Sequence, residues 1–208
     1  MFRFPRAITA TAGVATATLM SLATVAAPAS AASSTPASEA TNLVRANPGA
    51  RRLDATTVRL GPGLIAKALP GTATLGVPTK CDYKYVCMYS DAQDAVHGGG
   101  WLLEAYQCGY FDLGQLSYPD GGRWNDRISA LYNNQTPGTG ADFYNFNGSN
   151  RWDLEIGLNQ GDYLLDLSTS GQGANDVIDG IDVCDTGNID GWRPTTPISQ
   201  WVGQQKLM

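Results

Sequence analysis

The sequence predicts an all-β fold, a sandwich or barrel of about eight short strands within residues 80–185. Short runs of aromatic and β-branched residues are separated there by Gly, Asn and Asp, which favour turns. Apolar and polar residues alternate along 177–183, and no window carries a sustained helical repeat. The expected strands cover residues 84–90, 101–106, 109–113, 127–133, 141–146, 152–156, 162–167 and 177–183.

These strands fall into two similar halves of about 50 residues each. An aromatic strand, a Gly-containing corner, an apolar strand, an irregular loop, an Asn-Asp pair and a final strand recur in the same order. Two copies of a unit this long cannot form a solenoid. We therefore expect two four-stranded Greek-key motifs packed face to face.

Residues 1–31 have the three parts of a secretory signal peptide. Arg3 and Arg6 precede a charge-free stretch over 7–27, and small residues follow up to Ala31, where we expect cleavage. Thr, Ser and Gly interrupt the stretch, which argues against a membrane anchor. No other segment has the roughly 18 apolar residues of a spanning helix. We expect a secreted, extracellular protein that has no membrane contact once the signal is removed.

Residues 32–79 are expected to be a linker or pro-segment, followed by a domain at 80–185 and a tail at 186–208. The small-residue stretch that begins this segment is typical of disordered linkers. Further on, Gly61, Pro62 and Gly63 predict the turn of a short basic hairpin. A lone hairpin is marginal in water, so it docks on the domain or remains mobile.

Charge is divided unevenly between these segments. Residues 32–80 contain 6 Lys/Arg and 2 Asp/Glu, a net charge of +4, whereas residues 81–184 contain 4 and 15, a net charge of −11. The opposite signs favour docking of the hairpin on the domain. A domain this acidic repels nucleic acid and anionic lipid, which leaves cations and basic protein surfaces as partners.

The even number of cysteines predicts two disulfides in an exported chain, with three possible pairings. Cys81 and Cys87 are favoured as one pair because their short separation can close a tight loop beside a strand. Cys108 and Cys184 would then tie the middle of the domain to its last strand. A zinc site is disfavoured, since the cysteines lack a paired Cys-x-x-Cys spacing.

The stretches CDYKYVCMYSD and WNDRISALYNN, with the two-fold repeat, resemble bacterial βγ-crystallin-like domains over residues 81–184. Within that superfamily the chain is similar to the exported metallopeptidase-inhibitor group. The resemblance implies a sandwich of two Greek keys and inhibition of a secreted peptidase by a loop between the halves. The matching loop, residues 133–140, lacks the cysteine that tightens it in the family.

The same resemblance implies calcium as a ligand. The family pattern is two Asn/Asp residues, two variable residues, Ser/Thr and Ser. Asn125, Asp126 and Ser129 match it in the first copy, and Asn175, Asp176 and Asp179 stand at these positions in the second. Ala130 and Gly180 depart from the last position. Hard oxygen ligands of this kind suit Ca²⁺, and the two segments could share sites crosswise. The alternative is that both Asn-Asp pairs only form Asx-turns at the start of a strand.

The sequence does not predict an enzyme. The one histidine, His97, lies in a Gly-rich corner, and no nucleophile elbow, zinc-protease motif or phosphate-binding loop is present. Three classes of function remain: a peptidase inhibitor, a calcium-binding extracellular structural or sensing domain, and a carbohydrate-binding domain. The last would need an exposed stacking face, whereas most of the aromatic residues are expected in the core. The aromatics considered are Trp101, Trp124, Trp152, Tyr83, Tyr85, Tyr89, Tyr106, Tyr110 and Tyr144.

Overall fold

The computed structural model describes residues 35–70, 80–92, 95, 98–147, 151–171 and 173–184. All of them belong to one compact unit, Ser34–Met208. The expected signal peptide, His97 and the whole of the expected tail lie outside the described residues.

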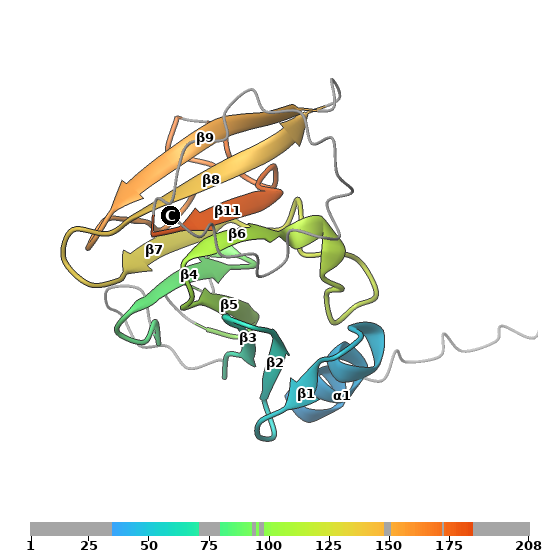
Figure 1. The fold of residues 1–208 in the computed structure, drawn as a ribbon. Coiled ribbons are helices and arrows are strands. Elements are labelled where there is room, and N and C mark those ends of the chain that lie inside the picture. The colour runs from blue at the N-terminus through green and yellow to red at the C-terminus, as the bar shows by residue number, and fades with distance from the viewer. Residues whose placement is uncertain are drawn as a thin grey trace, which may run out of the picture. The chain divides into compact units, whose positions relative to one another are not determined.

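The described chain forms two antiparallel sheets and one α-helix, so the all-β prediction is confirmed at the level of fold class (Figure 1). The seven-stranded sheet has the order β1 (Arg51–Arg52), β2 (Thr57–Gly61), β3 (Leu64–Ala68), β5 (Trp101–Ala105), β4 (Tyr85–Tyr89), β7 (Ala130–Asn134) and β10 (Tyr163–Leu164). The four-stranded sheet has the order β6 (Gly109–Asp112), β11 (Gly180–Val183), β8 (Gly140–Asn147) and β9 (Arg151–Asn159). A short 3-10 helix, η1 (Leu113–Gln115), follows β6.

Each half of the sequence repeat gives its third strand to the other sheet. β4, β5 and β7 of the first half lie together, but β6 lies beside β11. β8, β9 and β11 of the second half lie together, but β10 lies beside β7. The two halves are therefore interlocked.

Alternation along the strands directs one set of side chains into the core between the sheets. Met88 and Leu131 of the larger sheet belong to the same buried cluster as Phe143, Ile181 and Val183 of the smaller sheet. Side chains of successive strand residues point to opposite faces, so this single register determines which residues are buried.

Two of the expected strands begin later than predicted. The strands expected at 127–133 and 177–183 start at Ala130 and Gly180, because the residues before them form turns that contact each other. The strand expected at 162–167 shortens to the two residues of β10. Asp166 ends it by accepting hydrogen bonds from the backbone and side chain of Ser168, an Asx-turn.

The prediction of a disordered linker is wrong for residues 36–46, which form helix α1 (Pro36–Ala46). Thr35 and Ser38 make a reciprocal capping box, and Pro36 occupies the first turn, where its missing N–H is not needed. Ala40 and Leu43 are fully buried. The small residues suggested a linker, but capping and the burial of one face stabilise a helix.

The predicted hairpin is present as β2 and β3, and it is part of the larger sheet. β3 pairs with β5 along its whole length, so one sheet joins residues on both sides of the boundary predicted at 79/80. Val58, Leu64 and Ala66 are fully buried, and apolar packing thus contributes most of the attachment.

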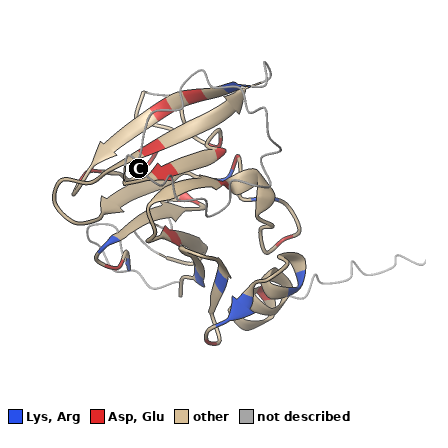
Figure 2. Ribbon diagram, viewed as in Figure 1, with Lys and Arg blue, Asp and Glu red and all other residues tan. Residues whose placement is uncertain are grey.

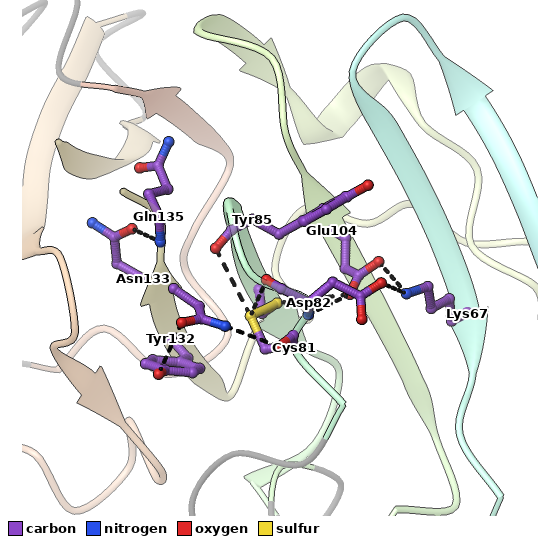
Figure 3. Close-up of a disulfide and its surroundings, with 10 residues drawn as sticks. Lys67, Cys81, Asp82, Tyr85, Glu104, Tyr132, Asn133 and Gln135 are labelled. Atoms are coloured by element: carbon purple, nitrogen blue, oxygen red, sulfur yellow. Dashed lines mark hydrogen bonds and ion pairs between the residues drawn. A yellow bond between two sulfur atoms is a disulfide. The ribbon is translucent and has the colours of Figure 1, made fainter. Parts of the chain in front are cut away.

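One buried ion pair adds to this attachment. Lys67 Nζ lies 2.5 Å from Glu104 Oε2 and 2.7 Å from Asp82 Oδ2, beside the disulfide of Cys81 (Figure 3). The side chain of Glu104 is fully buried and that of Asp82 is exposed. Burial raises the pKa of Glu104 more than the neighbouring Lys67 lowers it.

The two disulfides join Cys81 to Cys87 and Cys108 to Cys184, the pairing that the sequence favoured. The first closes the loop before β4, and the second links the start of β6 to the end of β11. Disulfides of this kind are typical of proteins in oxidising environments. No helix within the described ranges is both long and apolar enough to cross a membrane.

Candidate functional site

The two Asn-Asp pairs form matching tight turns. Asp126 and Asp176 have φ angles of 57° and 54°, in the left-handed region that Asp and Asn tolerate better than most residues. In each turn the Asn side chain donates to the next carboxylate, at 2.8 Å from Asn125 Nδ2 to Asp126 Oδ2 and 2.7 Å in the second copy. Both copies thus form the same turn, in which the bond joins two side chains and not, as in an Asx-turn, a side chain and its own backbone.

The turns lie against each other, far apart in sequence but adjacent in space. The backbone N–H of Asp126 donates to Ile178 O at 3.3 Å, and that of Asp176 donates to Ile128 O at 3.2 Å. Ser129 Oγ donates to Asp176 Oδ1 at 3.0 Å. The six predicted ligands therefore do not form one site per copy, because each turn faces the Ser129 or Asp179 position of the other copy.

Ser129 and Asp176 line a first cavity of about 580 Å³, together with Ser90, Asp91, Asn125, Asp126, Arg123 and Arg127. Arg127 is 2.9 Å from Asp120 and lies over the ring of Tyr118. The two guanidinium groups offset two of the three negative charges that Asp91, Asp126 and Asp176 bring to this cavity. A cation is therefore less favoured here than in a cavity without arginines.

Asp179 lines a second cavity of about 340 Å³ with Asp112, Asn125, Asp126, Asn145 and others. Its side chain is nearly buried, Oδ2 accepts from the backbone N–H of Phe146 at 2.8 Å, and Oδ1 has no hydrogen-bond partner. Burial raises the pKa of Asp179 to about 6, against the Phe146 hydrogen bond and the nearby Asn125 amide, and the charges of Asp126 and Asp112 add to the rise. A cation would supply the missing partner.

Asp112 is a residue of this cavity that the sequence did not indicate. Its Oδ1 accepts from the backbone N–H of Gly114 at 2.8 Å, and its Oδ2 has no hydrogen-bond partner. Burial raises the pKa of Asp112 against the Gly114 hydrogen bond and the nearby Gln115 side chain. The repeat contains the signal that would have found it. Asp112-Leu113 in the first half corresponds to Asp166-Leu167 in the second. The N–H of Leu113 donates to Asp179 O, and the N–H of Leu167 donates to Ser129 O, so each contacts the other half in the same way.

Among the described residues, no basic side chain lines the second cavity, whereas two arginines line the first. The charge of the second cavity therefore favours a cation more than the charge of the first cavity does. In the part of the chain that the structure describes, however, no three His, Cys, Asp or Glu side chains already surround one point as metal ligands would. Binding a cation there requires the carboxylates to turn towards it.

A second candidate site is the loop between β7 and β8, in the region that the family resemblance indicated. Thr136–Thr139 forms a turn in which Thr139 N–H donates to Thr136 O at 3.2 Å and Gly138 has a φ of 87°. Pro137 and Gly138 are exposed at the tip. A side chain added at Gly138 would meet no atom within 4 Å.

The base of this loop is held by buried polar side chains. Asn133 is fully buried and donates from Nδ2 to Thr139 O at 3.3 Å, while its Oδ1 accepts from the backbone N–H of Gln135. Gln135 is also buried and donates from Nε2 to Cys184 Sγ at 3.2 Å. An exposed tip thus rests on a fixed base that is attached to the Cys108–Cys184 disulfide.

Within the described ranges, the tryptophans do not form the exposed face that sugar stacking needs. Trp101, Trp124 and Trp152 are each at most 3% exposed, which agrees with their expected place in the core. Of the tyrosines considered, Tyr83 is well exposed, at 58%.

No known family, curated protein or solved structure matches this chain, so its function is inferred from its own residues and contacts.

Proposed function

We propose that the protein is a secreted, disulfide-stapled binding protein with a βγ-crystallin-like sandwich of two Greek keys. The exchange of β6 and β10 between the sheets supports this, because each half gives the same strand, its third, to the sheet of the other half. The reciprocal hydrogen bonds between the two Asn-Asp turns support the same relation.

Its proposed activity is inhibition of a secreted metallopeptidase, with the Thr136–Thr139 turn inserted into the enzyme's cleft. The observation that carries this proposal is the combination of an exposed tip and a fixed base. Pro137 and Gly138 project into solvent, while buried Asn133 and Gln135 hold the ends of the loop. A loop already in its bound shape loses little conformational entropy on binding, which raises affinity.

The test is a titration of a thermolysin-like metallopeptidase with the purified protein. We expect the hydrolysis rate to fall as the protein reaches the enzyme concentration. Pro137→Glu places a charge at the tip and should weaken inhibition by about tenfold or more, a loss typical of a central interface residue. Gln160→Glu makes the same change of charge at another exposed turn and should inhibit like the unmodified protein.

An unchanged hydrolysis rate at micromolar protein would refute inhibition of this enzyme class. Equal weakening by both variants would show that the loop is not the contact surface.

A second candidate function is calcium binding, favoured by the second cavity. Asp112 and Asp179 each present one buried carboxylate oxygen without a partner, and Asp126 and Asn125 line the same space. These are oxygen ligands of the type that Ca²⁺ uses. The chemistry would be structural: a bound ion would neutralise the carboxylates and hold the two turns together.

Calcium binding predicts a higher melting temperature in millimolar Ca²⁺, reversed by EGTA, because a ligand that binds the folded state stabilises it. Asp179→Asn should abolish the shift, whereas Glu155→Gln on β9, outside both cavities, should preserve it. If Ca²⁺ leaves the melting temperature unchanged, the Asn-Asp pairs serve as turns alone.

A further inference from the structure

The edge of the larger sheet places two arginines directly opposite each other. β1 and β2 pair in antiparallel register with Arg51 opposite Arg59 and Arg52 opposite Val58. Side chains directly opposite on neighbouring strands share a face, with Cβ atoms about 5 Å apart. Two positive charges in this position repel each other unless an anion lies between them.

The two arginines differ from their neighbour Arg52, whose guanidinium makes four hydrogen bonds. Arg52 donates to Thr41 Oγ1 and to the backbone oxygens of Ala37, Asp54 and Ala55, which ties α1 to the hairpin. These bonds place α1 on the Arg52 side of the strand pair. Arg51 and Arg59 therefore project from the opposite side.

Arg51 and Arg59 make no ion pair within the described part of the chain. Arg59 Nε is buried and has no hydrogen-bond partner, while Arg51 is exposed at the sheet edge. Further along the same face, Glu104 is already paired with Lys67. A buried guanidinium N–H without an acceptor is costly, so this position favours an acceptor from outside.

The local charge agrees with an anionic ligand. Residues 35–70 contain Arg45, Arg51, Arg52, Arg59 and Lys67 against Glu39 and Asp54, a net charge of +3. Figure 2 shows basic residues on α1, β1, β2 and β3, whereas β8, β9 and β11 carry acidic ones. The hairpin was expected to place its positive charge on the acidic domain, but among the described residues of 35–70 only Lys67 forms an ion pair there.

We propose that Arg51 and Arg59 bind a phosphate group, free or carried on a polymer. Two guanidinium groups offer planar forks of N–H donors that match the oxygens of phosphate. A doubly charged tetrahedral anion can accept from both forks at once and also from Arg59 Nε. A single carboxylate has fewer oxygens and half the charge.

The direct test follows the side-chain Nε–Hε NMR signals of the arginines while inorganic phosphate is added to the purified protein, at ionic strength held constant with chloride. We expect the Arg59 signal to move in a saturable manner, with the Arg51 signal moving in step. A parallel titration with polyphosphate distinguishes the sources: tighter binding, counted per phosphate, would indicate a polymeric ligand.

Arg51→Ala removes one exposed fork and should weaken phosphate binding by about tenfold, the effect of one charge-assisted contact. Arg45→Ala is the matched control, because Arg45 is an exposed arginine of α1 and the change in net charge is the same. Equal weakening by the two variants, or an Arg59 signal that does not move, would overturn the proposal. Unchanged Trp fluorescence and melting temperature of Arg51→Ala in chloride would show that its fold is intact.

Discussion

The buried ion pair between Lys67 and Glu104 gives the sharpest prediction about how the N-terminal hairpin is held. Lys67→Met keeps most of the aliphatic length of the side chain but leaves the Glu104 carboxylate, which is fully buried, without its cation. Breaking a buried pair from one side costs about 3–5 kcal/mol. Lys67 is itself 23% exposed, and Asp82 N–H still donates to Glu104 Oε1 at 3.2 Å, so we expect the lower end of that range.

A loss of about 3 kcal/mol corresponds to a fall in melting temperature of roughly 6–12 °C for a protein of this size. Glu104→Gln should cost less, about 1 kcal/mol, because Lys67 retains the exposed Asp82 as a partner and the amide that replaces the carboxylate is uncharged. Lys84→Met is the matched control, since Lys84 is an exposed lysine without an ion pair in the described part of the chain.

The pH dependence separates this explanation from a simple loss of packing. Without Lys67, burial raises the Glu104 pKa further above its unfolded value, so the folded state prefers the protonated carboxyl. The loss of stability in Lys67→Met is therefore present at high pH, where Glu104 is ionised, and disappears as the pH falls towards the ordinary pKa of Glu. The assay is urea unfolding of both variants at several pH values. A Lys67→Met deficit no larger than that of Glu104→Gln, or one that does not shrink in acid, would refute the reasoning.

Two further predictions concern the carboxylate at the second cavity and the disulfides. The pKa of Asp179 is about 6 in the folded protein and 3.8 in the unfolded chain. Ionising this carboxyl in the folded state therefore lowers the free energy of unfolding, an effect that is absent in acid and grows as the pH rises through 6. Asp179→Asn should therefore raise the free energy of unfolding of the calcium-free protein by up to about 3 kcal/mol at pH 7.5, but not at pH 4. Urea unfolding at the two pH values measures this, and an equal effect at both would contradict the prediction. Replacing both cysteines of the Cys108–Cys184 pair by serine should lower the free energy of unfolding by about 4.5 kcal/mol, because these cysteines are 76 residues apart. The same change in the Cys81–Cys87 pair, whose cysteines are 6 residues apart, should lower it by about 2.2 kcal/mol. Equal losses of melting temperature in the two double variants would show that loop length does not determine the effect.

Much of the fold followed from local pattern. Aromatic and β-branched runs located the strands of both sheets, and turn residues located the hairpin at Gly61–Gly63. The helix at Pro36–Ala46 was missed because its evidence is a Thr35–Ser38 cap and two buried apolar residues, Ala40 and Leu43, and burial depends on a surface made by distant strands.

The candidate sites divide in the same way. The Asn-Asp pairs were visible as turns, and a crosswise sharing of sites between the copies was one of the expectations, but only the structure shows that each turn faces the other copy. Asp112 in the second cavity lay outside every motif considered, and the basic hairpin gave no sign that Arg51 and Arg59 would lie opposite each other. These residues stand out because of their neighbours in space, their burial and their lack of a hydrogen-bond partner. None of these properties can be recognised from the residues beside them in the sequence.

By itself, the sequence determined the period-two strands, the internal repeat, the cysteine pairing that it favoured, and the separation of basic and acidic segments. Only the tertiary structure decided which strands exchange between sheets, that β3 joins β5, and that Glu104 is buried against Lys67 while Arg51 and Arg59 face each other. The physical reason is the distance along the chain over which each interaction acts. Turn and strand preferences act within a few residues, whereas burial and ion pairing depend on segments that the chain brings together from far apart.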